Sequence, residues 1–168
     1  MALPKASLDA SFWINAHQAG LIPLLPEYFH LFVCSEVERE ILHPLIAKGL
    51  PVAAALQFRE WCETKIITRQ EPACPVDWYH IGENAAIALA IDSNYILLID
   101  DQNPYHYARS RGLRVVNTAD FVVLLYHVGK LSYTTAESTI GRLGLGKHLA
   151  RTALAVLGAL ARRKGERR

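Results

Sequence analysis

The sequence predicts an α/β fold, a three-layer α/β/α domain with a central, mainly parallel sheet. Strands and helices alternate between residues 95 and 128, and this order is typical of a parallel sheet covered on both faces. The clearest strand, residues 95–99, is an unbroken run of strand-forming side chains. With 168 residues, 51% of them hydrophobic, the chain is long enough to bury one substantial core.

The first half of the chain is expected to build the same alternation. Its hydrophobic pattern predicts a strand at 6–8, a helix at 11–19, a helical or irregular segment at 22–28 and a strand at 29–33. Ser35 and Glu38 have the spacing of a capping box, and the helix that they open is expected to end at Leu42, ahead of Pro44. A helix at 52–64, a short strand at 65–68 and a loop at 70–79 follow.

The second half of the chain carries the clearest periodicity. We expect a helix at 83–91, a strand at 95–99, a helix at 104–111, a strand at 113–116 and a helix at 120–128. Beyond Gly129 the pattern is helical, and 147–162 form the last helix. The sequence therefore predicts an α/β domain over 1–131 and a helical, basic extension over 132–168.

Cysteine usage and hydropathy argue against several protein classes. The three cysteines are odd in number and contain no CxxC pair, which argues against a disulfide framework or a thiolate zinc site and fits a reducing compartment. No stretch has the pattern of a signal peptide or the length of a membrane span. A cytoplasmic protein without membrane contact is expected.

The net charge of +2 conceals an uneven distribution. From Lys147 onward there are seven Lys and Arg residues against one acid, a balance of +6, so the rest of the chain carries −4. A basic end of this kind either contacts a polyanion such as RNA or only keeps a frayed terminus soluble. The sequence leaves both interpretations open.

Acidic residues stand at four places where apolar elements begin or end: Asp9, Glu40, Glu83 and the pair Asp100–Asp101. Asp9 and the pair follow predicted strands, and ligands of open parallel sheets collect at the carboxyl ends of the strands. Several carboxylates gathered there would repel one another unless a hard divalent cation lay between them. A Mg²⁺ or Mn²⁺ site, commonly used in phosphate chemistry, is the leading hypothesis.

Three of these four positions also have a purely structural explanation. Asp9 has the position of a helix N-cap, and Glu83 that of a first-turn acid that stabilises the helix dipole. One member of the Asp100–Asp101 pair would cap the next helix, which leaves the second unexplained. Glu40 instead borders the apolar face of its helix, because Val37 precedes it by one turn, and a carboxylate there calls for a partner or a metal.

The order of these residues resembles a PIN domain, the metal-dependent nuclease fold of VapC-type toxins, and in particular the PIN-like group with an Asp-Asp block. The similarity covers roughly residues 3–131. Its four segments are 8–14 (LDASFWI), 32–41 (FVCSEVEREI), 82–90 (GENAAIALA) and 97–101 (LLIDD), the last followed by Ala108-Arg109 and Gly112-Leu113. The opening strand is poor in Val, Ile and Leu, and Asn117–Asp120 stands where relatives have Gly-Thr, so that Asp120 is either an additional acid or a helix cap.

The resemblance implies a metal-dependent ribonuclease that hydrolyses phosphodiester bonds of single-stranded RNA. Its metal-binding and catalytic acids would be Asp9, Glu40, Glu83 and Asp100 or Asp101. Ser11 would orient the first carboxylate from behind the metal ligands. Mg²⁺ or Mn²⁺ would be the cofactor, and an antitoxin protein and a second copy of the chain in a homodimer would be partners.

Two further residues are candidates for substrate binding. His106 and Arg109 follow the acid pair on the same predicted helix and would contact a substrate phosphate, although solvent exposure alone also explains them.

Three alternatives to a nuclease remain. A catalytically silent PIN-like module would bind RNA or protein with the same fold. A phosphoacceptor receiver domain also uses an Asp pair, but after its first strand. A small-molecule hydrolase of doubly wound fold is the third, although no glycine-rich phosphate loop is present.

Overall fold

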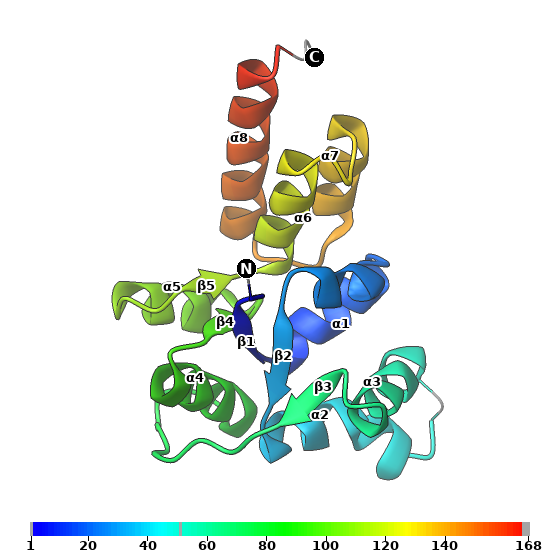
Figure 1. The fold of residues 1–168 in the computed structure, drawn as a ribbon, viewed down its shortest axis with the longest axis vertical. Coiled ribbons are helices and arrows are strands. Elements are labelled where there is room, and N and C mark those ends of the chain that lie inside the picture. Colours follow the sequence, from blue (N-terminus) through cyan, green and yellow to red (C-terminus); the bar gives the residue numbers. More distant parts are fainter. Residues whose placement is uncertain (1, 51, 166–168) are drawn as a thin grey trace.

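The computed structural model describes residues 2–50 and 52–165. Its centre is a five-stranded sheet in the order β3-β2-β1-β4-β5, in which every neighbouring pair is parallel (Figure 1). The strands are β1 (Lys5–Leu8), β2 (His30–Val33), β3 (Ile67–Arg69), β4 (Ile96–Leu98) and β5 (Val115–Val116). The predicted α/β fold with a parallel sheet is confirmed.

Helices connect the strands and extend beyond the sheet. They are α1 (Ala10–Gln18), the 3₁₀ helix η1 (Ile22–Glu27), α2 (Ser35–Ile46), α3 (Ala53–Glu63), α4 (Ile81–Ser93), α5 (Gln102–Ser110), α6 (Thr118–His127), α7 (Tyr133–Arg142) and α8 (Lys147–Arg163). The last three pack against one another to one side of the sheet (Figure 1). No helix in the described ranges is long and apolar enough to cross a membrane.

The central strand β1 is poor in strand-forming side chains yet has a neighbour on each side. Leu8 is opposite Leu98 of β4, and Ser7 is opposite Phe32 of β2. The Ser7 hydroxyl is fully buried and donates a hydrogen bond to the Ala86 carbonyl of α4, at 2.8 Å. This bond removes the penalty of burying a polar group and ties β1 to the helix that carries Glu83.

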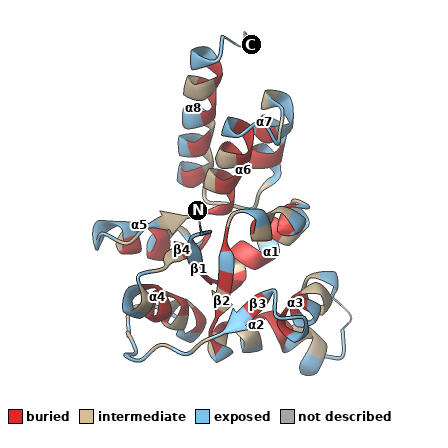
Figure 2. Cartoon of the chain, in the orientation of Figure 1, coloured by how far each residue is buried: buried red, intermediate tan, exposed pale blue. Residues whose placement is uncertain are grey.

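One hydrophobic core runs from the sheet into the helical extension. Beside the sheet, the Trp13 indole meets the ring edges of Phe58 and Trp61 at centroid distances of 5.2 and 5.5 Å. The buried faces of α7 and α8, which include Ile140 and Leu157, belong to the same core (Figure 2). The extension therefore packs on the α/β domain, while the proposed boundary at 131 stays a prediction.

Two expectations for helix α2 are wrong. The helix does not end at Leu42 but continues through Pro44 to Ile46, although an internal proline removes one main-chain hydrogen bond and crowds the preceding turn. The burial of Ile41 and Leu42 in the core supports this turn. The capping box does not form, because Cys34 is the N-cap residue and makes no side-chain cap bond. Glu38 instead accepts two hydrogen bonds from Arg69 of β3, at 2.6 and 2.7 Å.

Three helix starts lie two residues earlier than expected, at 81, 102 and 118 instead of 83, 104 and 120. The first two residues of these helices are polar or small except for Ile81, which is exposed, so the apolar periodicity begins after the helix itself. This difference places Glu83 and Asp120 at the third helical position, where their side chains complete capping boxes.

Replacement of Phe58 by alanine tests the core. We expect a loss of about 3–5 kcal/mol in the free energy of unfolding, because Phe58 is fully buried against Trp13. Urea denaturation followed by circular dichroism measures it. Ile46→Ala, at a helical side chain that is 74% exposed, is the matched control and should change stability by less than about 0.5 kcal/mol. Equal losses in both variants would contradict the described core.

Candidate functional site

Two buried aspartates meet at the carboxyl edge of the sheet. Asp9 follows β1 and Asp100 lies two residues beyond the end of β4, and these strands are neighbours. The Asp9 amide donates to the Leu98 carbonyl at 3.0 Å, which fixes the ends of the two strands together. Only 2% of Asp9 and 4% of Asp100 is exposed. Parallel topology thus brings together two acids that are 91 positions apart.

Ser11 connects these two aspartates. Its hydroxyl and its amide both donate to Asp9 Oδ2, at 2.5 and 2.9 Å, so Asp9 is also the N-cap of α1. The same hydroxyl oxygen accepts the amide proton of Asp100 at 3.1 Å. Ser11 therefore holds the Asp9 carboxylate against the main chain of the second aspartate.

The Asp100 carboxylate is fixed by hydrogen bonds to both of its oxygens. The main-chain amide of Thr118 donates to Oδ1 at 2.6 Å. The Thr118 hydroxyl and the side-chain NH₂ of Asn15 both donate to Oδ2, each at 2.6 Å. Thr118 follows β5, so it reaches the site from the next strand along the sheet. Asp100 is thereby held in one orientation by two elements.

Glu40 and Glu83 approach the site from α2 and α4. A methyl group at Gly82 would lie 2.3 Å from Glu40 Oε2, so the absence of a side chain at position 82 makes room for this carboxylate. Glu83 follows directly and accepts the His80 amide proton at 3.1 Å, as a first-turn acid was expected to do. Glycine at 82 therefore allows the two glutamates to come close to one another.

Asp101 completes the acidic group and is exposed. Asp101 occupies the N-cap position of α5, but its side chain makes no cap bond there. The Asp100 side chain does not cap this helix either, because it accepts hydrogen bonds from Asn15 and Thr118. Neither member of the pair thus caps this helix with its side chain. The capping explanation for the pair is wrong.

Burial raises the pKa of both buried acids. Desolvation raises the pKa of Asp9 from 3.8 to about 7, and the Glu40 and Asp101 carboxylates add to this, while the hydrogen bonds from Ser11 oppose it. Desolvation likewise raises the pKa of Asp100 to about 6, with Asp101 adding to it and the bonds from Thr118 and Asn15 opposing it.

Glu40 joins the same electrostatic group. Partial burial raises the pKa of Glu40, the Glu83 and Asp101 carboxylates raise it further, and His80 lowers it. Each of the five candidate acids thus acts on at least one other. The ion pairs of the described residues lie elsewhere, between Arg39 and Glu36, Arg69 and Glu38, and Lys130 and Glu27.

The donor set fits a hard divalent cation. Carboxylate oxygens are the ligands that Mg²⁺ and Mn²⁺ prefer, and a cation would offset the repulsion that raises these pKa values. In the ranges that the structure describes, however, no three acids, histidines or cysteines are arranged to hold one ion between them as they stand. Carboxylates that repel one another are more stable when they point apart. Binding of a divalent cation would therefore require some of the acidic side chains to rotate toward it.

The two predicted substrate-binding residues have other contacts. Arg109 donates to the Tyr105 hydroxyl at 2.9 Å and lies over that ring, and the hydroxyl in turn donates to Asp120. The His106 ring lies 5.3 Å from that of His148 in α8. Both residues are exposed, and their phosphate contact stays a prediction.

Asp120 is a helix cap and not an additional member of the acidic group. Its carboxylate accepts the Asn117 amide proton, and the Asn117 side chain accepts the Asp120 amide proton. The Tyr105 hydroxyl binds the same carboxylate at 2.9 Å. Of the two explanations offered by the sequence, capping is the one observed.

The sequence did not reveal Asn15 and Thr118 as site residues. Asn15 lies six positions after Asp9 in an otherwise ordinary helix, and nothing in the pattern marks it. Thr118 had a signal, because it stands in the segment where relatives carry Gly-Thr. Its role follows from β5 lying next to β4, which only the strand order shows.

The helical extension also reaches this edge. A methyl group at Gly146 would lie 2.2 Å from the Gln102 side chain, which directly follows Asp101. A methyl group at Gly144 would lie 3.7 Å from Asn15 Oδ1, and Asn15 binds Asp100. The segment between α7 and α8 therefore crosses beside the acids.

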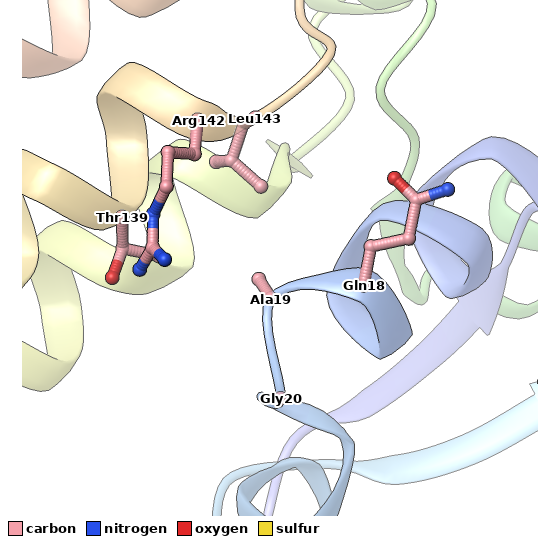
Figure 3. Close-up of a pocket in the computed structure, with 6 residues that line it drawn as sticks. All are labelled: Gln18, Ala19, Gly20, Thr139, Arg142 and Leu143. Atoms are coloured by element: carbon pink, nitrogen blue, oxygen red, sulfur yellow. The ribbon is translucent and has the colours of Figure 1, made fainter.

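A separate cavity of about 310 Å³ lies between the end of α1 and α7. Figure 3 shows Gln18, Ala19 and Gly20 on one side and Thr139, Arg142 and Leu143 on the other. None of the candidate acids lines it, since Asp9 stands at the opposite end of α1. This cavity is not the candidate active site.

The raised pKa of Asp9 predicts how stability depends on pH. The folded protein keeps a proton on Asp9 up to about pH 7, whereas the unfolded chain loses it near pH 4. The free energy of unfolding should therefore fall as pH rises from 4 to 8, by an amount on the order of a few kcal/mol. Urea denaturation across this range measures it.

Asp9→Asn is the matched variant, because asparagine keeps the size and capping ability of the residue. Its unfolding free energy should fall less steeply with pH than that of the wild type. Mn²⁺ should stabilise the wild type more at pH 8 than at pH 5.5, since protons and metal compete for the same oxygens. Parallel curves for wild type and variant would show that Asp9 does not titrate in this range.

Comparison with solved structures finds similar chains, and the likeness of the one described here is limited. It is a PilT N-terminus domain protein, SSO1118, from the hyperthermophilic archaeon Sulfolobus solfataricus P2. The two are 16% identical, with a TM-score of 0.40, over 67% of this chain and 86% of the other. No curated protein matches the chain.

A family model gives the assignment. The model described as "DUF3368: PIN domain" matches residues 6–149, which include all five candidate acids and the start of the helical extension. PIN domains are generally nucleases and generally use divalent metal ions. The match and the arrangement of acids at the carboxyl edge of a parallel sheet lead to one conclusion: the chain belongs to the PIN domain family.

Proposed function

We propose that this PIN domain is a Mg²⁺- or Mn²⁺-dependent ribonuclease that hydrolyses phosphodiester bonds of single-stranded RNA. The observation that carries the proposal is the convergence of five carboxylates, from four separate segments, at one edge of the sheet. Two of them, Asp9 and Asp100, are buried without a basic partner among the residues that the structure describes. Such an arrangement costs stability in the absence of a cation, which supports a role in binding one.

The acids differ in their freedom to bind an ion. Both oxygens of Asp100 already accept hydrogen bonds from Thr118 and Asn15, so we assign it the role of a fixed negative charge. Asp101 is exposed and makes no cap bond, which favours it over Asp100 as the direct ligand. Asp9, Glu40 and Glu83 would supply the remaining oxygens.

A bound divalent ion would lower the pKa of a water molecule and stabilise the negative charge that develops on the phosphate. Ser11 would keep the Asp9 carboxylate in a single orientation during this step. Attack of the water oxygen on phosphorus would break the bond to the 3′ oxygen, which leaves a 5′-phosphate and a 3′-hydroxyl. No nucleophilic serine or cysteine is required.

A catalytically silent RNA- or protein-binding module is the second candidate. One observation favours it: among the described residues, the acids are not yet arranged as three ligands around one ion. In that case the acids would serve only the capping and hydrogen-bonding roles seen for Asp9 and Glu83. Cleavage that depends on metal would exclude this candidate.

The toxin role belongs to the proposal by resemblance alone. It includes a cytoplasmic location, a small antitoxin protein as inhibitor and a homodimer as the active form. Light scattering of the purified chain tests the dimer. Inhibition by the product of a neighbouring short reading frame tests the partner.

Cleavage of a 5′-labelled single-stranded RNA tests the activity. We expect cleavage with Mn²⁺, none with EDTA, and at least about a hundredfold loss in Glu83→Gln and Asp101→Asn, because each variant removes a charged ligand. Gel electrophoresis of the products measures the rate. Glu60→Gln, an exposed acid on α3 outside the site, is the control and should cleave like the wild type. Equal cleavage by all four proteins would point to a contaminating nuclease.

A further inference from the structure

We propose that Trp78, Tyr79, Tyr107 and Arg111 form a stacking platform for the bases of single-stranded nucleic acid beside the acidic group. The proposal rests on the proposed function, because it names the surface that would hold the substrate next to the cleaved bond. Aromatic side chains bind single strands without strict sequence preference, since every base offers a flat π-face. We refer to these four residues as the platform.

The rings of the platform form one continuous group. The Tyr107 ring lies between the other two, with centroid distances of 4.9 Å to Trp78 and 5.8 Å to Tyr79, both edge-to-face. The Arg111 guanidinium lies 5.6 Å from the Trp78 ring centre and 5.9 Å from that of Tyr107. A cation over aromatic rings combines stacking with attraction to phosphate, which suits a nucleotide chain.

The platform is only partly buried. All three aromatic residues have intermediate exposure, and Arg111 is exposed. Trp78 and Tyr79 pack one side against the hydrophobic core, which leaves part of each side chain at the surface. The parts of these rings that remain at the surface are available to a flat base.

A buried asparagine holds the platform rigid. The Asn84 side-chain oxygen accepts the amide protons of Trp78 and Tyr79, at 2.9 and 2.7 Å. Its side-chain NH₂ donates to the Tyr79 carbonyl at 2.7 Å. Three bonds from one residue fix this part of the 70–80 loop, so that little conformational freedom would be lost when a base stacks on it.

The platform adjoins the acids at two points. Asn84, which fixes the loop, directly follows Glu83 in α4. The Tyr79 hydroxyl donates to the Asn103 carbonyl at 3.4 Å, and Asn103 lies two residues after Asp101. A strand whose phosphate lay at the acids would therefore have neighbouring bases within reach of Tyr79 and Tyr107.

A second aromatic cluster, formed by Phe32, Tyr95 and Lys5, serves as a control. There the Phe32 and Tyr95 rings lie 4.7 Å apart, and Lys5 Nζ lies 5.5 and 5.6 Å from their centres. Lys5 begins β1 and Tyr95 precedes β4, whereas the acids follow the ends of these strands. This cluster has the same chemistry without the acidic neighbours.

Activity on two substrates, a single-stranded RNA and a small phosphodiester, distinguishes a role in base stacking from a role in catalysis. Trp78→Ala and Tyr107→Ala should lower kcat/KM for a single-stranded RNA roughly 5- to 100-fold, mainly through KM, as expected for the loss of one stacked base. Both should leave Mn²⁺-dependent hydrolysis of bis(p-nitrophenyl) phosphate unchanged, since this diester has no bases. Trp78→Phe should retain most of the RNA activity, and Tyr95→Ala should behave as the wild type.

Two results would overturn the proposed platform. One is an equal loss of activity on both substrates, and the other is a loss of RNA cleavage in Tyr95→Ala as large as in Trp78→Ala. If neither substrate is hydrolysed by the wild type, the proposed nuclease function fails, and the platform is then judged by binding alone. Thermal denaturation of each variant identifies any that fail to fold. Arg111→Gln, at an exposed residue, supplies a variant that should fold normally and still weaken RNA binding.

Fluorescence gives a readout that requires no catalysis. Of the three tryptophans, Trp13 and Trp61 are buried, so Trp78 is the one that a ligand can reach. Single-stranded oligonucleotide in EDTA should quench the emission, whereas an RNA duplex, whose bases are hidden, should not. Trp78→Phe should abolish the change. Quenching that persists in this variant, or quenching by duplex alone, would contradict the proposal.

Discussion

The burial of negative charge at one edge of the sheet is the constraint on which the rest of this structure depends. Asp9 and Asp100 lie where β1 and β4 end, almost entirely buried and, within the described part of the chain, without a basic partner. Hydrogen bonds from Ser11, Thr118 and Asn15 compensate only part of the cost, which is why both carboxyl groups bind protons more tightly than usual. A protein that merely had to fold would gain from apolar residues at these positions.

Much of the fold follows from local pattern, whereas much of the site does not. The strand at 96–98 and the helices around it were predictable because parallel strands buried on both faces leave a continuous apolar signature. Pro44 misled the prediction of α2, since tertiary packing outweighs the loss of one hydrogen bond. The five acids could be named from the sequence because each follows or borders an apolar element.

The residues that position the acids were not predictable, for a physical reason. Asn15 and Thr118 reach Asp100 from 85 and 18 positions away, so their contact depends on which strands are neighbours. Asn84 gave no signal either, since an amide inside an apolar helix resembles any other polar substitution until the 70–80 loop is seen against it. Periodicity describes one element at a time, and these contacts join several.

The crossing of the segment between α7 and α8 beside the acids has a consequence for how the molecule can be divided. Gly146 lies so close to Gln102 that a side chain at position 146 would require Gln102 to move, and Gly144 lies near Asn15, so this stretch lines the acidic edge. A fragment that ended at residue 131 would keep all five candidate acids but would lose the segment between α7 and α8 that lies beside them. It would also lose the apolar side chains of α7 and α8 that cover α6. The helices at the end of the chain therefore contribute, like the sheet, to the surroundings of the acidic group.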